Sequence, residues 1–497
     1  MATDADDPAS WSRVVGITAV SFAILGVLTY GRAIFPTYGR LDNYVGVMHS
    51  QLGELRTGVG HSWLQAGRII PAVFGSLIFL FVDAVGDLQL LRVVSTLMIS
   101  MAGAGITVLV LRLSPRPWSR YTVVLATVAG AVAISTTASP SAATWAIQAI
   151  PLGALPSALA AGIFATTEKS FFGIHWVVPT SVFLMIAAFS YQQFVPVALL
   201  PVLIWTAARW ANRRGAPHWG RAPAMVAMCV TALGLNFLFI LAFGDGALDR
   251  ISGYSLSERA NWFLGTYLPR TIDVFVPSSP RRAAVSVAIL AVFLVAPAIA
   301  GVRYLALSLA VLIGWIASAL VVFPTELWAS YRLIYPAQFV LWGGATAGVA
   351  VSLASARFDN RWILRLVTPG LVVVGLFSLS VAGFRAYSYI AVPNRVDWAS
   401  TRCTIANEIG WSVVLTTEPE DARSSVISYD EYGVISSGVD WVLPYTVWLA
   451  MGETRSEGAF PHLSLDQIKV HPIQDLEGLP PGNVLRITQD ECGSLGE

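Results

Sequence analysis

Residues 39–68 form a polar segment, GRLDNYVGVMHSQLGELRTGVGHSWLQAGR, that follows the first apolar stretch of the chain. Asp42 lies a few residues past the end of that stretch, beside Arg40, Asn43 and Tyr44. A carboxylate at the boundary of an apolar bundle is costly to place, so its presence there indicates a use. It can accept the proton of an attacking hydroxyl group, and we predict this catalytic-base role for Asp42, with its three neighbours contacting substrate.

Asp42 also fits a purely structural role. An Asp directly before an apolar-periodic run is a common helix N-cap. The run in this chain consists of Tyr44, Val45, Val47, Met48, Leu52 and Leu55. On the residues alone, both interpretations stay open.

A phosphate leaving group needs cations, and arginine offers a planar fork that matches phosphate oxygens. Arg68 and Arg332 are the strongest candidates, because each lies at the mouth of an apolar segment beside polar or aromatic residues. Contact with lipid headgroups is the ordinary role of arginines at such positions. Glu326 precedes Arg332 by six residues and either pairs with it or binds the second substrate.

Tyr191 and Gln192, followed by Gln193, interrupt two apolar runs. Phenol and amide groups suit sugar hydroxyls, and they equally suit hydrogen bonds between helices. His49 and His61 have no third ligand at metal spacing, so no metal site is predicted, no cofactor is expected, and dependence on a divalent ion stays open.

The composition places these residues in a membrane. The chain has 497 residues, of which 55% are hydrophobic and only 12% charged. Soluble domains carry about 25% charged residues, and apolar stretches of spanning length, ~17–25 residues, recur through residue 386. The net charge of +1 gives no reason to expect a nucleic-acid partner. The acidic N-terminus is expected to form a short tail before an uncleaved first span.

We expect about eleven membrane spans. The apolar segment 69–85 is excluded from that number because it is short and contains Pro71, Gly75 and Asp83; we expect it to lie along the outer face. The sequence SPSAAT at 139–144 is expected to be a polar turn. The expected spans are 14–35, 88–113, 121–138, 145–166, 175–190, 194–208, 223–243, 283–300, 304–323, 333–354 and 366–385.

Three arginine-rich loops, near 112–120, 209–221 and 355–365, are expected to be cytoplasmic, because loops of this composition stay inside. With eleven spans and a cytoplasmic N-terminus, the Asp42 segment, the turn at Tyr191 and the C-terminal residues then all lie on the outer face.

The chain is expected to divide into a membrane domain, residues 1–389, and a small α/β extracytoplasmic domain, residues 390–497, with strand-like VVLTT and VLRIT. The membrane domain would include outer-face segment 36–87 and outer loop 244–282. Cys403 and Cys492 bracket the C-terminal domain, and an oxidising compartment permits a disulfide between them; two unpaired thiols are the alternative.

An interfacial Asp after the first span, juxtamembrane helices, many spans and an external C-terminal domain together resemble the C-type glycosyltransferase fold, GT-C. Asp42, the Trp63–Gly67–Arg68 run and the Tyr191–Gln192 pair resemble the O-antigen glucosyltransferase family within it. The resemblance implies a bacterial plasma-membrane enzyme that takes a sugar from polyprenyl phosphate and adds it to a surface polysaccharide. Such families often have paired acids where this chain has Asp42–Asn43.

The resulting hypothesis is an inverting-type transfer of a hexosyl or pentosyl unit from a polyprenyl-phosphate donor to an extracytoplasmic cell-wall or surface glycan. A polysaccharide polymerase or ligase is the alternative enzyme. In that enzyme the arginines would be the key residues of the functional loops, and Asp42 would be dispensable. A transporter or flippase of lipid-linked sugars is the alternative of another class; it predicts charged residues in mid-span and internal repeats.

Overall fold

The computed structural model describes thirteen ranges of the chain. They are residues 8–39, 42–53, 59–167, 175–212, 220–244, 254–274, 280–324, 331–355, 361–407, 414–417, 443–454, 469–472 and 484–486. Arg40, Glu326 and Cys492, and the side chain of Asp42, lie outside the described residues.

The protein is a helical, multi-pass membrane protein. Within the described ranges, eight helical stretches are long and apolar enough to cross a membrane. They are Trp11–Ile34, Val85–Leu113, Val177–Ala211, Arg221–Phe243, Arg281–Ala300, Val302–Leu320, Tyr331–Ser355 and Val367–Ile405. Most of them are runs of several helices: α1 (Pro8–Ile34), α5 (Leu88–Leu113), α9 (Val177–Tyr191), η6 (Gln192–Ala198), α10 (Leu199–Ala211), α11 (Arg221–Phe243), α15 (Pro280–Val295), η8 (Ala296–Ala300), η9 (Val302–Tyr304), α16 (Leu305–Leu320), α17 (Tyr331–Gln338), η10 (Phe339–Gly343), α18 (Gly344–Ser355), α19 (Arg361–Arg385), η11 (Ala386–Ala391) and α20 (Val392–Asn407).

The stretch Val177–Ala211 folds back on itself at Tyr191, where α9 ends and the backbone is extended (φ −162°, ψ 98°). Arg221 lies 5.1 Å from the ring of Trp176, just before α9, and 5.4 Å from the ring of Trp205, near the end of α10. The beginning and the end of this stretch therefore come together at Arg221. The polar interruption expected at Tyr191 is therefore the point at which this stretch reverses direction.

Two further apolar helices, α6 (Arg120–Ala133) and α8 (Ala154–Ala165), are too short to be counted among the eight stretches. The expected number of eleven spans stays a prediction. The sequence SPSAAT, expected to be a polar turn, is instead the buried helix α7 (Ser139–Thr144). Its burial is possible because Gln338 of α17 accepts the N–H of Ala138 at 3.0 Å and so satisfies the backbone where α7 begins.

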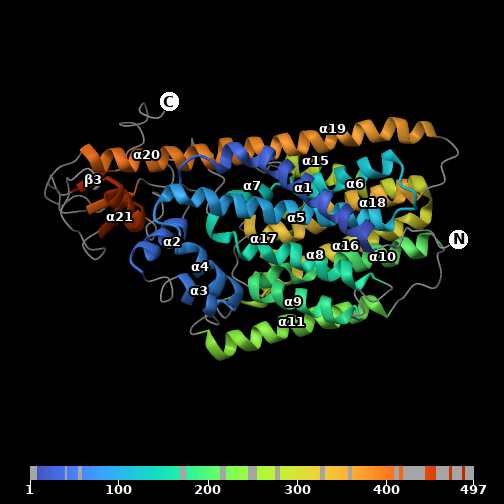
Figure 1. Cartoon of the computed structure of the whole chain (residues 1–497), viewed down its shortest axis with the longest axis horizontal. Coiled ribbons are helices and arrows are strands. Elements are labelled where there is room, and N and C mark those ends of the chain that lie inside the picture. The colour runs from blue at the N-terminus through green and yellow to red at the C-terminus, as the bar shows by residue number, and fades with distance from the viewer. Residues whose placement is uncertain are drawn as a thin grey trace.

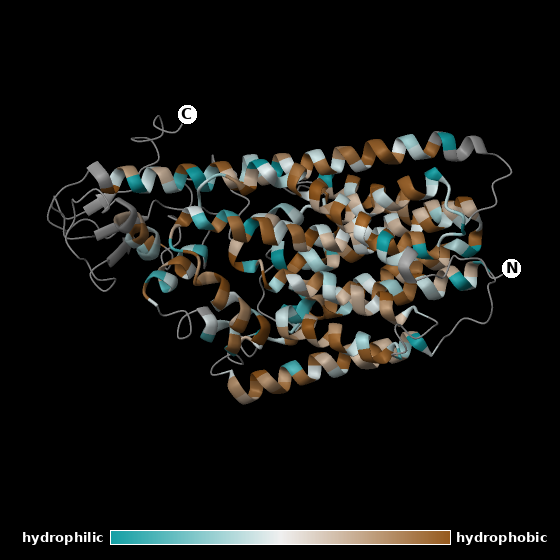
Figure 2. Cartoon of the chain, viewed as in Figure 1, coloured by the Kyte–Doolittle hydropathy of each residue, from teal (hydrophilic) through white to brown (hydrophobic). Residues whose placement is uncertain are grey.

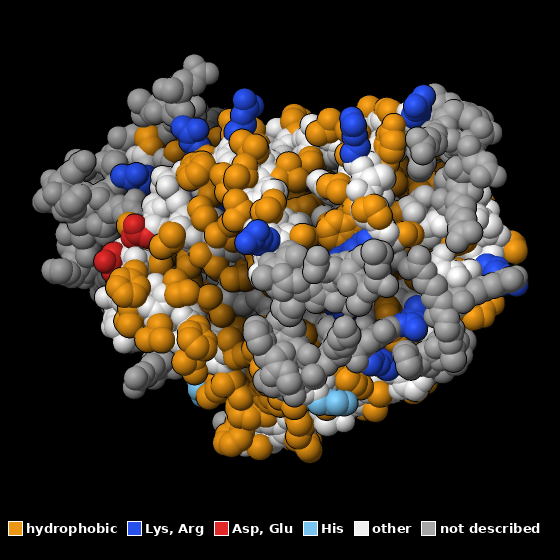
Figure 3. Space-filling model, turned by 45° about the vertical axis from the view of Figure 1, so that its right-hand side comes forward, with side chains coloured by type: hydrophobic (Ala, Val, Ile, Leu, Met, Phe, Trp, Pro, Cys, Tyr) orange, Lys and Arg blue, Asp and Glu red, His pale blue; other side chains and the backbone are white. Residues whose placement is uncertain are grey.

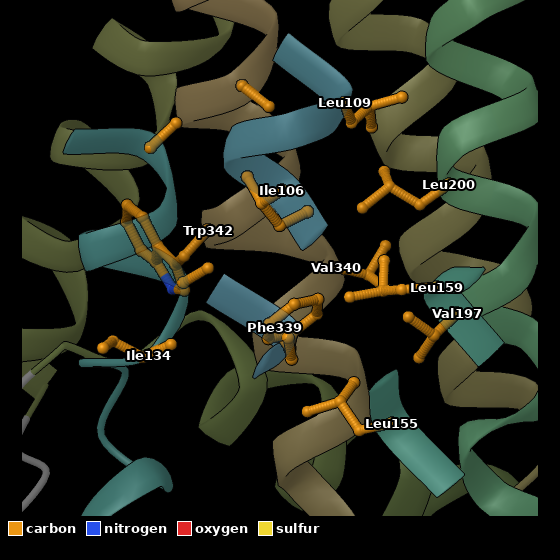
Figure 4. Packing of buried hydrophobic residues seen from close by; sticks show 14 of the residues in the cluster. Ile106, Leu109, Ile134, Leu155, Leu159, Val197, Leu200, Phe339, Val340 and Trp342 are labelled. Atoms are coloured by element: carbon orange, nitrogen blue, oxygen red, sulfur yellow. The ribbon is translucent and has the colours of Figure 1, made fainter. Parts of the chain in front are cut away.

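The centre of the bundle is an apolar core. Figure 4 shows side chains of α5, α8, η6, α10 and η10 interdigitating around Ile106, Leu159, Leu200 and Val340. Figure 2 shows the same apolar character along the outward faces of α11 and α19, as expected where helices meet lipid.

Described residues in or beside the three arginine-rich loops lie toward the N-terminal end of the molecule (Figure 1). Arg116 lies over the ring of Trp11 at 4.4 Å, which places the loop after α5 beside the start of α1. The Tyr304 hydroxyl contacts Asn212, and the Asn212 amide donates to Ser355 at 3.5 Å. On the face drawn in Figure 3, basic side chains of the described residues lie along the whole length, whereas the acidic side chains that are drawn lie toward the opposite end.

The opposite end carries short helices. Figure 1 shows α2, α3 and α4 there, together with α20 and α21, far from the N-terminus. Segment 69–85 does not cross the bundle but packs on α2: the Ser50 hydroxyl bonds to the Phe79 carbonyl, and Gln51 donates to the Asp83 carbonyl at 2.5 Å. The further short elements of the chain are α2 (Asp42–Gln51), α3 (Val59–Gln65), η2 (Pro71–Gly75), α4 (Ser76–Phe79), η3 (Val85–Asp87), η4 (Ala146–Gln148), η5 (Pro151–Gly153), α13 (Leu256–Trp262), η7 (Phe263–Tyr267) and α14 (Leu268–Ile272).

Among the described residues after 390, a three-stranded parallel sheet of order β2-β1-β3 occurs together with helices α20 and α21, so helices and strands are both present, as expected. The strands are β1 (Val414–Thr417), β2 (Lys469–Pro472) and β3 (Val484–Arg486), and α21 spans Leu443–Thr454. The expected boundary at 389/390 falls inside the continuous helical run α19–η11–α20. One hydrophobic cluster includes Tyr44 of α2, Trp398 of α20 and Val447 of α21, so the C-terminal domain shares a core with the Asp42 helix.

Candidate functional site

The turn that leads to Asp42 is held by a buried arginine of α5. Arg92 has no exposed surface, and its guanidinium donates to the carbonyls of Ile34 (2.9 Å), Pro36 (2.7 Å) and Tyr38 (2.7 Å). It also lies over the ring of Tyr38 at 4.0 Å. The last carbonyls of a helix have no partner within it and carry partial negative charge. Arg92 satisfies the last carbonyl of α1, that of Ile34, and two carbonyls of the turn beyond it, and thereby fixes the path of the chain toward α2.

Tyr44, near the start of α2, ties the same turn to the C-terminal domain. Its hydroxyl accepts the N–H of Gly39 at 3.1 Å, and its ring stacks on Trp398 with centroids 5.4 Å apart. Both side chains are buried. The structure therefore gives Tyr44 a packing role in the core, whereas the sequence analysis placed it against substrate.

Asn43 binds the loop after α7. Its Oδ1 accepts the N–H of Ile147 at 3.0 Å, and the residue has no exposed surface. Its Nδ2 is buried and has no hydrogen-bond partner among the described residues. One end of this amide is thus structural, and the other is available to a bound group.

Three distant segments of the chain therefore converge on residues 34–44: α5 through Arg92, η4 through Ile147, and α20 through Trp398. Asp42 begins α2 in the middle of this arrangement. Capping a helix does not by itself require contacts from three distant segments. A functional group, in contrast, must be held rigidly by its neighbours.

Arg332, at the start of α17, lies near the same end. Its guanidinium is 5.4 Å from the centroid of the Trp145 ring, and the side chain is half-buried. Trp145 immediately precedes η4, whose Ile147 binds Asn43. The short segment 145–147 therefore contacts both Arg332 and Asn43, two residues that were predicted to bind substrate.

Arg68 is the second half-buried arginine, and it lies over the ring of Tyr191 at 4.4 Å. The preceding residue, Gly67, has φ +73°, and its carbonyl accepts the amide of Asn236 at 2.7 Å. The same amide donates to the Ala188 carbonyl of α9 at 3.1 Å. The run Trp63–Arg68 is thus anchored on α9 and α11, and the predicted pair of Arg68 and Tyr191 is in contact.

Gly67→Ala is expected to lower the free energy of unfolding by about 1–3 kcal/mol more than Gly53→Ala does, because overpacking is added to backbone strain. A Cβ at Gly67 would lie 2.7 Å from Ile240 and 2.9 Å from Asn236. Gly53 is the matched control, since its φ is +70° but no atom lies within 4 Å of its added Cβ. Unfolding of both purified variants in detergent measures the difference, and equal losses would contradict the packing argument.

The fold-back at Tyr191 carries three buried oxygens without a donor among the described residues: the Tyr191 hydroxyl, Gln192 Oε1 and Gln193 Oε1. Buried polar atoms are normally hydrogen-bonded, so three consecutive exceptions indicate a place where a bound molecule supplies the donors. Burial, followed by the effect of Tyr191, raises the pKa of the nearby Tyr267 hydroxyl, which donates to the Leu333 carbonyl at 2.8 Å. Tyr267 therefore stays neutral and acts as a structural donor.

Aromatic contacts connect the two arginines. Tyr191 contacts Phe194 (5.6 Å between centroids), and Phe194 contacts Tyr335 of α17 (6.2 Å), less than one turn from Arg332. The structure thus places Arg68, Tyr191, Asn43 and Arg332 at one end of the bundle around α17.

Several predicted residues and pairings are not placed by the structure. Arg40, Glu326 and Cys492 lie outside the described residues, so their predicted roles stay predictions. Cys403 is disulfide-bonded, while Cys229 is a free, buried thiol.

Two supporting residues were not singled out in the sequence. Arg92 could have been found, because it is a charge within the otherwise apolar span 88–113, and such charges have partners or functions. Trp398 gave no local signal, since its importance comes from packing on Tyr44 across more than three hundred residues. Among the residues that the structure describes, no group of three or more His, Cys, Asp and Glu gathers to hold a metal.

Comparison with known proteins leaves the family open. No family model matches the chain, and no curated protein is similar to it. Among solved structures, it is similar to the crystal structure of ArnT from Cupriavidus metallidurans in the apo state, with a TM-score of 0.44 and 12% identity over 94% of this chain and 90% of that one. A likeness at this level establishes neither family nor activity, so function has to be argued from the chain's own residues.

Proposed function

We propose that the protein is a glycosyltransferase of GT-C type that moves a sugar from a polyprenyl-phosphate donor to an extracytoplasmic glycan. The observation that carries the proposal is the convergence of α5, η4 and α20 on the segment that contains Asp42. It occurs at the same end as two half-buried, aromatic-stacked arginines. A firmly held helix start at the proposed base, together with stacked cations at the same end, suits a hydroxyl nucleophile and a phosphate leaving group.

The grouping of arginine-rich loops around the N-terminal end supports the orientation. Positively charged loops stay in the cytoplasm, so the opposite end, with α2 and the C-terminal domain, would face outward. A polyprenyl phosphate holds its sugar at the membrane surface, and we place the start of α2 at that level because the first apolar stretch ends just before it. The donor sugar would therefore meet the residue proposed as the base without leaving the interface.

The proposed reaction is a single displacement. The acceptor hydroxyl oxygen attacks the anomeric carbon of the donor, and the bond from that carbon to the phosphate oxygen breaks. Asp42 takes the hydroxyl proton, and the electron pair of the broken bond leaves with the polyprenyl phosphate. Arg332 and Arg68 would stabilise the charge that develops on the phosphate, with Arg332 closer to Asn43 through the Trp145 loop.

The experiment is a donor panel. The purified protein, reconstituted in vesicles, is given polyprenyl phosphates that carry glucose, galactose, mannose or arabinose, with bacterial cell-wall glycan as acceptor. For at least one donor, we expect polyprenyl phosphate to be released while the glycan gains one sugar. Release of no polyprenyl phosphate from any donor would contradict the proposal.

Arg332→Gln is expected to raise the KM for the donor by about 10- to 100-fold, since a hydrogen bond to a charged group contributes about 1.5–3 kcal/mol. Arg303→Gln is the matched control, because Arg303 is exposed in the turn at the N-terminal end. Steady-state kinetics in vesicles with the active donor measure both. An unchanged donor KM in a folded Arg332→Gln protein would exclude this arginine from the phosphate site.

A further inference from the structure

Arg221, the first residue of α11, is fixed in place at the end of the molecule opposite to α2 (Figure 1). Its Nη1 donates to the carbonyls of Ala165 and Thr167, both at 2.6 Å. The last carbonyls of α8 carry partial negative charge, so a cation is stabilised there. The guanidinium also lies 5.1 Å from the ring centroid of Trp176 and 5.4 Å from that of Trp205. Arg221 is therefore held rigidly, unlike an arginine that only reaches toward the membrane surface.

One edge of the Arg221 guanidinium remains for a ligand. Arginine has five N–H groups in a planar fork, and Nη1 carries only two of them. Among the residues that the structure describes, Nε and Nη2 of Arg221 make no hydrogen bond. The side chain is half-buried, so this edge can be reached from outside. Nε and Nη2 present two parallel N–H groups, which match two oxygens of one phosphate or carboxylate.

Two further arginines lie around the end of α8. The guanidinium of Arg209 is 5.2 Å from the centroid of the same Trp205 ring. Arg112 donates to two carbonyls at this helix end, at 3.5 and 3.4 Å. Arg112, Arg209 and Arg221 thus form an arginine cluster at a helix C-terminus, which offers only about half of one negative charge.

The sequence around the arginine cluster adds positive charge. The segments 112–120 and 209–221 contain seven arginines and no acidic residue. Segment 163–169, at the end of α8, contains one glutamate and one lysine, whose charges cancel. The cluster therefore keeps a surplus of positive charge, and such a surplus between helices attracts the phosphate groups of anionic lipids.

The helices that carry the arginine cluster also face lipid. Trp176 immediately precedes α9, and Arg221 begins α11. Val178 and Val182 of α9 and Val226 of α11 are exposed apolar side chains. Tryptophan side chains concentrate at the level of lipid headgroups. A phospholipid can therefore place its acyl chains on these spans and its phosphate at the cluster, whereas an acidic peptide would leave the apolar surface uncovered.

We propose that the arginine cluster binds the headgroup of an anionic phospholipid, with Nε and Nη2 of Arg221 donating to two phosphate oxygens. A zwitterionic lipid carries a cation near its phosphate, and Arg209 and Arg112 repel that cation. Lipids of net negative charge are therefore expected to bind more tightly than zwitterionic ones. The bound lipid would join the ends of α8, α10 and α11. The inference does not depend on the proposed sugar transfer, because the cluster lies at the opposite end from Asp42.

The test uses purified, delipidated protein in a neutral detergent. The probes are dihexanoyl phosphatidylglycerol, which is anionic, dihexanoyl phosphatidylcholine, which is zwitterionic, and inorganic phosphate. Arg221→Lys keeps the charge but removes the planar fork. Arg209→Gln removes one neighbouring charge and leaves the bonds of Arg221 in place. Arg303→Gln is the matched control, because Arg303 is an exposed arginine at the same end of the molecule.

The readout is the unfolding temperature as a function of probe concentration, which gives an apparent Kd for each probe. Phosphatidylglycerol is expected to stabilise the wild type at lower concentration than phosphatidylcholine or inorganic phosphate. Its apparent Kd is expected to rise about tenfold in Arg221→Lys, since a hydrogen bond to a charged group is lost. A rise of about two- to fivefold is expected in Arg209→Gln, the effect of one surface charge, and no change in Arg303→Gln.

Three results would overturn the proposal. Equal stabilisation by the two phospholipids would remove the preference for an anionic headgroup. Inorganic phosphate that binds as tightly as phosphatidylglycerol would assign the cluster to a soluble anion. An unchanged Kd for phosphatidylglycerol in a folded Arg221→Lys protein would exclude the fork. Where Arg221→Lys does not fold, equal Kd values in Arg209→Gln and Arg303→Gln would refute the site, since binding would then follow overall charge alone.

Discussion

Asp42→Asn is expected to lower the rate of sugar transfer by about 10²–10⁴-fold, the range that general-base catalysis contributes. The amide is nearly isosteric with the carboxylate and still caps a helix, but it cannot accept the acceptor's proton. The variant is therefore expected to unfold at the temperature of the wild type. Loss of activity without loss of stability separates the base from the capping role that the sequence left open.

Asp83→Asn is the matched control for this experiment. Asp83 is an exposed carboxylate at the same end of the molecule, and its carbonyl accepts the Gln51 amide of α2. It is expected to retain full turnover with the active donor in vesicles. A folded Asp42→Asn protein with near-normal turnover would remove the base assignment, and the arginine-led polymerase or the flippase would then be the better hypothesis.

Arg92→Met is expected to lower the free energy of unfolding by about 3–5 kcal/mol, because a buried guanidinium with several hydrogen bonds is removed and its partners stay buried. Three carbonyls of the turn 34–38 would lose their donors. Arg92→Lys keeps the charge but not the planar fork, so an intermediate loss is expected. Thermal unfolding in detergent measures both variants.

Arg32→Met provides the comparison for Arg92→Met. Arg32 is in the last turn of the same helix α1 but its side chain is exposed, so its removal is expected to change stability by about 0.5 kcal/mol or less. Transfer activity adds a second measure, because loosening the turn before Asp42 would lower turnover even where the protein folds. Equal stability of the Arg92 and Arg32 variants would show that the turn is held by other contacts.

The membrane class and most of the spans were predictable because they depend on local composition. An apolar run of spanning length can be seen in the residues themselves, and so can its interruption at Tyr191. Segment 69–85 was correctly excluded from the spans for a local reason as well, since it is short and contains Pro71 and Gly75. The strand-like VVLTT and VLRIT likewise correspond to β1 and β3.

The sequence analysis failed where burial depended on distant partners. The sequence SPSAAT is polar, and nothing local predicts that α7 is buried; Gln338, two hundred residues away, satisfies the backbone at its start. Tyr44 was expected to contact substrate because it lies beside Asp42. Its ring packs on Trp398, a contact that the sequence did not indicate, and the predicted substrate contact stays a prediction.

The sequence by itself therefore determined that this is a multi-pass helical protein with an isolated carboxylate and several arginines at one set of span ends. Only the tertiary structure decided which of these groups meet. Arg68 lies on Tyr191, Arg332 on Trp145, and the Asp42 helix on α20 of the C-terminal domain. The physical reason is that spans are specified by the local cost of burying polar groups, whereas a site is specified by contacts between segments whose separation in sequence carries no signal.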